Sequence, residues 1–87
     1  MPAKNLGVLA VVVTFQPDDT LIQHLRALGE QVSSIVVVDN GSTNIEAIEL
    51  AVSETGCRLV KNSLNLGIAK ALNQGATIAL AEGFGWL

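Results

Sequence analysis

The sequence has little cysteine, few basic residues and no long apolar run, and each shortage excludes a class of protein. Cys57 is the single cysteine, so neither a disulfide framework nor a cysteine-based zinc site can form within one chain. A cytoplasmic setting fits this composition. The five Lys and Arg residues are scattered along a chain of net charge -3, which argues against a nucleic-acid-binding face. The apolar stretch 6–13 is far shorter than the ~20 residues of a membrane span.

What the 87 residues do contain is a regular alternation of short apolar runs and longer amphipathic stretches. The runs 7–14, 34–39 and 57–61 are typical of strands, and a fourth strand is predicted to begin at Phe84. Helices are predicted between them, and the last one spans Ile68 to about Glu82. The resulting order β-α-β-α-β-α-β predicts an α/β fold with a parallel sheet and right-handed crossovers.

Short polar signals indicate where the first two helices begin and end. Asp18 or Asp19 is expected to cap the first helix, since a carboxylate suits a helix N-terminus. Thr43 and Glu46 have the spacing of a capping box at the start of the second helix. Gly56 lies where a C-terminal cap of that helix belongs.

The third predicted helix has an apolar face and an internal glycine. Its face is predicted to consist of Ile68, Leu72, Ala76 and Ala79. Gly75 costs about 1 kcal/mol relative to alanine inside a helix. A close approach between this helix and a strand would explain the glycine.

Three polar clusters follow the first three predicted strands, at 14–17, 39–42 and 62–67. In an open parallel sheet, ligands bind outside the carboxyl ends of the strands. We therefore expect these three loop tips to meet on a common rim that can cradle a ligand.

Asp39 is the most distinctive residue of this rim. It ends an apolar strand and precedes Asn-Gly-Ser, where its carboxylate can accept a hydrogen bond from the imide N–H of uracil or thymine. It can equally cap its own turn or the next helix. Thr14 can bond a ribose or base, or only finish its strand. Both interpretations stay open for both residues.

The third cluster precedes a helix N-terminus, where backbone N–H groups attract phosphate oxygens. Asn65 and Gly67 can serve such a site or act only as cap and turn residues. Lys70 can reach a diphosphate or remain solvated. The adjacent Asp18 and Asp19 are interpreted as helix caps and not as a metal site.

The segments VVVTFQPD, IVVVDNGS and NSLNLGIAKALNQGATIALAEGFGWL together resemble the start of family 2 glycosyltransferases. The resemblance is nearest to the rhamnosyltransferase subgroup, which uses dTDP-rhamnose. It implies a Rossmann-like three-layer half of the GT-A fold, with a parallel sheet in the order 3-2-1-4. Residues 1–87 would then be one nucleotide-binding portion.

The resemblance also implies a set of nucleotide-sugar-binding residues. Residues 14–16 would line the nucleoside pocket and Asp39 would bind the pyrimidine base. Asn65, Gly67 and the helix through Asn73 would lie beside the nucleoside and the diphosphate. Many relatives carry Arg at the position of Leu72. The implied set is Thr14, Phe15, Gln16, Asp39, Asn40, Asn65, Gly67, Lys70 and Asn73.

No catalytic or metal-binding residue is assigned to the chain. In the family, an Asp-x-Asp metal motif follows the strand that here begins near Trp86, and the sequence ends at Leu87. A divalent cation, Mg²⁺ or Mn²⁺, is expected in the parent enzyme to stabilise the leaving diphosphate. We therefore expect the 87 residues alone to be inactive.

The favoured hypothesis is a parent enzyme that transfers rhamnose from dTDP-rhamnose, or a related donor, to a glycan or lipid-linked acceptor in polysaccharide biosynthesis. It would act in the cytoplasm or at the inner face of the membrane. One alternative is a non-catalytic module that self-associates through an exposed sheet edge and Trp86. A phospho-receiver ranks last, because Asp39 alone does not make the acidic cluster that it needs.

Overall fold

Strands and helices alternate along the chain in the predicted order. The structure, a computed structural model, describes residues 5–83 and 85–86. The predicted strand residues Phe84 and Leu87 lie outside these described residues. The elements are β1 Asn5–Thr14, α1 Leu21–Gly29, β2 Val32–Asp39, α2 Ile45–Thr55, β3 Arg58–Lys61, α3 Ile68–Ala81 and β4 Gly85–Trp86.

The described strands form one parallel sheet in the order β3-β2-β1-β4. This is the order that the family resemblance implies. β4 contributes two residues, which pair with Val8 and Leu9 of β1. At the other end of the sheet, Thr14 pairs with Asp39, and Asp39 pairs with Lys61. The last residues of β1, β2 and β3 therefore stand in one row.

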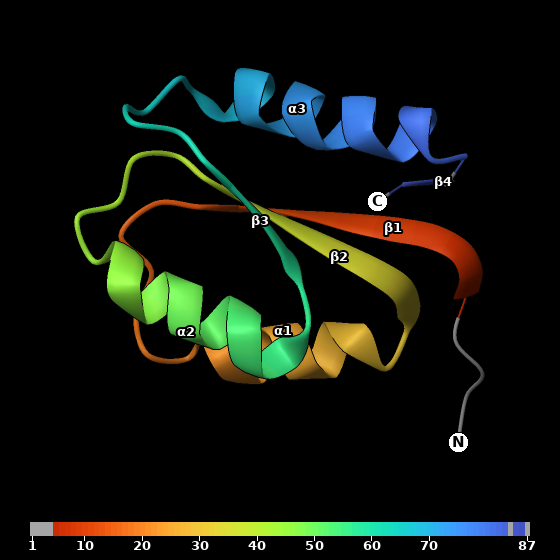
Figure 1. Cartoon of the computed structure of the whole chain (residues 1–87), viewed down its shortest axis with the longest axis horizontal. Helices are drawn as coiled ribbons and strands as arrows, with labels where there is room; N and C mark the ends of the chain where they lie inside the picture. The colour runs from red at the N-terminus through yellow and green to blue at the C-terminus, as the bar shows by residue number, and fades with distance from the viewer. Residues whose placement is uncertain (1–4, 84, 87) are drawn as a thin grey trace.

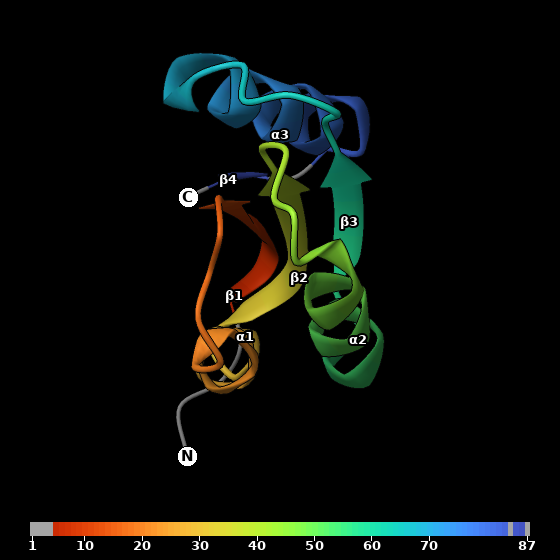
Figure 2. The ribbon, with the colours of Figure 1, turned by 90° about the vertical axis from the view of Figure 1, so that its left-hand side faces the viewer.

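Helices cover both faces of the sheet, which gives three layers (Figures 1 and 2). α1 and α2 pack on one face, where nine described residues form a buried apolar cluster that includes Leu25, Val37 and Ile48. α3 packs on the opposite face, where the buried cluster is Leu9, Val36 and Ala79. Because β1 and β2 are covered on both sides, their sequences are continuous apolar runs.

α3 faces the sheet with its smallest residues, so of the apolar face predicted for it Ala79 is buried, Leu72 and Ala76 are half-buried, and the prediction for Ile68 is wrong. Its buried residues are Ala71, Gly75 and Ala79, whereas Ile68 is 68% exposed. A methyl group at Gly75 would overlap both Cγ atoms of Val11. The helix therefore approaches β1 more closely than a face of large side chains would allow, which explains the glycine.

The predicted N-caps of α1 and α2 are wrong, although Gly56 caps α2 as expected, with φ 71°. α2 begins after Asn44, and Thr43 bonds to the β1–α1 loop instead of closing a capping box. α1 begins after Thr20, whose N–H and hydroxyl both donate to Asp18 Oδ1. Asp18 thus organises the turn before the helix and does not cap its first turn.

Candidate functional site

The three loops that follow β1, β2 and β3 lie together at one end of the sheet (Figure 1). Backbone hydrogen bonds continue the strand pairing into these loops. Asn40 N donates to Thr14 O, and Asn62 N donates to Asp39 O, each at 2.9 Å. The prediction that the three loop tips share one rim is confirmed.

Asp39 lies at the centre of this rim, and only 1% of it is exposed. Its Oδ1 accepts hydrogen bonds from Thr14 Oγ1 at 2.8 Å and from Ser42 Oγ at 2.6 Å. Its Oδ2 accepts from Ser42 N at 2.9 Å. The carboxylate therefore does cap its own turn. Each carboxylate oxygen offers about two acceptor positions, so one position on Oδ2 has no hydrogen-bond donor among the described residues.

Gln16 joins the β1–α1 loop to the β2–α2 loop through three hydrogen bonds. Its backbone N–H donates to Ser42 Oγ at 2.8 Å. Its side-chain Oε1 accepts from Thr43 N at 2.9 Å and from Thr43 Oγ1 at 3.1 Å. Gln16 also has φ 49°, a left-handed conformation that is uncommon for a residue other than glycine.

Asn40 fixes the β3–α3 loop against the end of β2, and it is only 3% exposed. Its Oδ1 accepts from Asn62 Nδ2 and Leu66 N, both at 3.1 Å, and its Nδ2 donates to Gly67 O at 3.2 Å. Asn62 in turn exchanges two side-chain hydrogen bonds with Gln74 of α3, at 2.8 and 2.9 Å. This amide network sets the position of the α3 N-terminus relative to the sheet.

The β2–α2 and β3–α3 loops also touch directly. A Cβ atom added to Gly41 would lie 2.8 Å from the carbonyl carbon of Leu64, and Gly41 has φ 89°. Both facts require glycine at this position, because a side chain would push the two loops apart.

The start of α3 contains the remaining predicted site residues. Asn65 Oδ1 accepts from Gly67 N at 2.8 Å, so Asn65 closes the turn that leads into the helix. Gly67 has φ 85° and stands at the N-cap position. Lys70 and Asn73 both lie on the exposed side of α3. A role of these residues in ligand binding stays a prediction.

An open hollow of about 470 Å³ runs beside the end of β1. The predicted residues Thr14, Phe15 and Gln16 line it, and Phe15 is 53% exposed. His24 of α1 also lines it. Thr14 connects this hollow to the rim, because its hydroxyl donates to Asp39.

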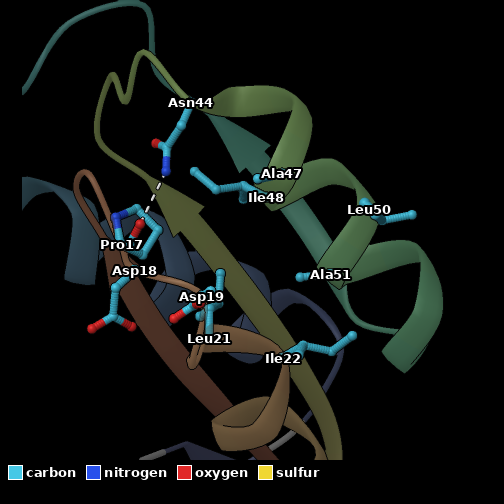
Figure 3. A pocket seen from close by; sticks show the side chains of 10 residues that line it. All are labelled: Pro17, Asp18, Asp19, Leu21, Ile22, Asn44, Ala47, Ile48, Leu50 and Ala51. Carbon is cyan, nitrogen blue, oxygen red and sulfur yellow. Dashed lines mark hydrogen bonds between the residues drawn. The ribbon is translucent and has the colours of Figure 1, made fainter.

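A second hollow, of about 180 Å³, lies between α1 and α2 (Figure 3). Its walls are mostly apolar and include Ile22, Ala47 and Ile48. Asn44 Nδ2 donates to Pro17 O across one end, at 2.9 Å. None of the predicted site residues lines it, so this hollow and the rim are separate features.

The described residues do not fit a divalent cation. Within 5–83 and 85–86, no group of three or more His, Cys, Asp or Glu side chains could hold a metal ion. Asp18 accepts hydrogen bonds from the side chain and the backbone of Thr20, and these lower the pKa of the Asp18 carboxyl.

Within the described residues, no helix is long and apolar enough to cross a membrane.

Two residues that build the rim, Thr43 and Gln74, lie outside the clusters predicted from the sequence, whereas Ser42 and Asn62 lie inside them but had no assigned role. Ser42 had a local signal, because a serine three residues after an aspartate often closes a side-chain turn. The others had none, since each bonds to a residue at least 12 positions away in sequence. Of the predicted residues, Thr14, Gln16, Asp39, Asn40 and Gly67 come together through hydrogen bonds.

The three layers, the parallel sheet and the polar rim at its carboxyl edge define a Rossmann-like α/β protein. The family model described as glycosyl transferase family 2 matches residues 9–87. The chain therefore belongs to glycosyl transferase family 2 and forms a nucleotide-sugar-binding portion of such an enzyme. No curated protein and no solved structure matches the chain.

Proposed function

We propose that the rim binds the nucleoside diphosphate part of a pyrimidine nucleotide sugar, with dTDP-rhamnose or a related sugar as donor. The half-domain would be that of the GT-A fold. The observation that carries this proposal is the row of Thr14, Asp39 and Asn62, from which three mutually bonded loops surround a buried carboxylate.

Asp39 gives the site its preference for thymine or uracil. The open acceptor position on Oδ2 suits the imide N–H of thymine or uracil, which adenine lacks. Phe15 offers an exposed ring beside Thr14, against which a base can pack. Backbone N–H groups at the start of α3, together with Lys70, suit the diphosphate.

The described residues contribute binding and orientation of the donor, and we assign no chemical step to them. Members of this family generally use a divalent cation, and no described cluster fits one. The whole enzyme would transfer the sugar to a glycan or lipid-linked acceptor. A bound nucleotide would hold the sugar–phosphate bond in a fixed place relative to the acceptor, and such positioning of reactants contributes to catalysis.

Titration calorimetry with dTDP, UDP and ADP tests the proposal. We expect both pyrimidine nucleotides to bind at least about tenfold more tightly than ADP, since a hydrogen bond to a charged group contributes about 1.5–3 kcal/mol. Asp39→Asn should reduce dTDP affinity by a similar factor. Glu30→Gln is the matched control, because Glu30 follows α1 at the end of the sheet away from the rim.

Equal affinity for ADP and dTDP, or an Asp39→Asn protein that binds as tightly as the original, would refute pyrimidine recognition. Light scattering on the same samples addresses the alternative of a self-associating module. A stable dimer without nucleotide affinity would support the module. The side chain of Trp86, which that alternative invokes, lies outside the described residues.

A further inference from the structure

The hydroxyl group of Ser42 is held from both sides. It donates to Asp39 Oδ1 at 2.6 Å and accepts the backbone N–H of Gln16 at 2.8 Å. The Ser42 backbone N–H also donates to Asp39 Oδ2 at 2.9 Å. Ser42 therefore contacts both oxygens of the carboxylate, and its own hydroxyl direction is set by Gln16.

Gln16 is anchored to the β2–α2 loop by its side chain as well. Oε1 accepts two hydrogen bonds from Thr43, the residue after Ser42. The left-handed φ of 49° costs energy for glutamine, and such a conformation persists only where the surroundings hold it. Here the holding contacts are those to Ser42 and Thr43.

We propose that Gln16 and Ser42 are positioning residues for pyrimidine recognition, a proposal that rests on the proposed function above. Together with Thr14 they orient Asp39, so that Oδ1 accepts from two hydroxyl groups and one acceptor position on Oδ2 has no donor among the described residues. A ligand then needs an N–H that reaches Oδ2, because Oδ1 already accepts two hydrogen bonds and offers little further binding energy. Gln16 acts through Ser42 and not through contact with the base.

The test compares dTDP with dTDP methylated at the N3 nitrogen of thymine, which removes the imide N–H. The original protein should prefer dTDP by about tenfold or more. In Ser42→Ala and Gln16→Gly this preference should fall to about threefold or less, because the carboxylate is no longer held in one orientation. Gln16→Gly keeps the backbone N–H and tolerates the positive φ, but it removes the anchor to Thr43 that holds this N–H against the Ser42 hydroxyl.

Two further variants separate positioning from a general structural effect. Ser42→Thr retains the hydroxyl group and should retain the preference. Ser53→Ala removes an exposed hydroxyl on α2 and should behave as the original. Circular dichroism and urea unfolding establish that each variant is folded at the temperature of the titration.

Two results would overturn the inference, and they differ. If Ser42→Ala and Gln16→Gly weaken the binding of dTDP and of N3-methylated dTDP equally, the preference for dTDP is kept. These residues then only stabilise the loops, while pyrimidine recognition stands. If the original protein binds both nucleotides equally, recognition of the imide N–H by Asp39 fails, and the inference fails with it.

Discussion

Gly75 shows how a single residue sets the distance between two layers. It lies on the buried face of α3 against Val11 of β1, with no space for a methyl group. Helix propensity alone would favour alanine by about 1 kcal/mol at this position. The close contact with the strand outweighs that preference.

We expect Gly75→Ala to destabilise the protein by about 1–3 kcal/mol, because overpacking forces the helix away from the strand. Urea unfolding followed by circular dichroism measures this loss. Gly29→Ala is the control, since its nearest neighbour would be Ile35 Cδ1 at 3.9 Å, and it should be neutral or slightly stabilising. A Val11→Ala change made together with Gly75→Ala should recover part of the loss, and purely additive effects would contradict this explanation.

At the scale of elements, an ion pair connects the beginning of β3 to the end of α3. The Arg58 guanidinium donates to both carboxylate oxygens of Glu82, at 2.5 and 2.8 Å. These hydrogen bonds lower the pKa of Glu82 from its ordinary 4.5 and raise the pKa of Arg58. The pair is well formed in geometry but lies largely in solvent.

A carboxyl group with a lowered pKa stabilises the folded state above its unfolded pKa and loses that effect as the pH falls through the folded value. We therefore expect Glu82→Gln to be slightly less stable than the original at pH 7. The difference should be small, because exposed pairs contribute little, and it should be lost as the pH falls from 4.5 through the lowered folded-state pKa of Glu82.

Urea unfolding across this pH range, at low and high salt, measures the effect of the pair. High salt should also reduce the difference at pH 7. Glu30→Gln is again the control, and it should show no such dependence. A difference between the two proteins that persists or grows in acid would show that the pair is not its source.

At the scale of the whole molecule, the two faces of the sheet are packed unequally. The cluster under α1 and α2 holds nine buried described residues, whereas the cluster under α3 holds three. The fully buried residues of α3 are alanine and glycine, and its larger Ile78 packs against the cluster only partly buried, so the helix removes little apolar area from water. The amide network of Asn40, Asn62 and Gln74 adds side-chain hydrogen bonds between α3 and the sheet, and it does so only in the N-terminal half of the helix.

We expect α3 to open locally before the rest of the domain unfolds. In native-state hydrogen exchange, backbone amides of α3 should be protected less than those of β2, which is buried on both faces. Gln74→Ala should lower protection in α3 further and leave β2 almost unchanged. Equal protection of α3 and β2 would instead indicate a single cooperative unit.

Much of the fold could be predicted from local patterns. The boundaries of the strands and helices agree with the apolar runs to within a few residues, because short-range propensity and hydrophobic burial decide where each element lies. The N-caps of α1 and α2 could not be predicted in this way, because the helices begin after Thr20 and Asn44 and not at the expected Asp18 and Thr43. Thr43 prefers Gln16, a partner 27 residues away, over the start of its own helix.

The sequence by itself determined the order of elements, the burial of β1 and β2 on both faces and the placement of three polar loops at one edge. These features depend on composition and spacing along the chain. Only the tertiary structure decided which side of α3 meets the sheet and which groups hold Asp39. Those choices depend on contacts between distant residues, and hydrogen bonds such as Gln16 to Ser42 exist only once the loops have met.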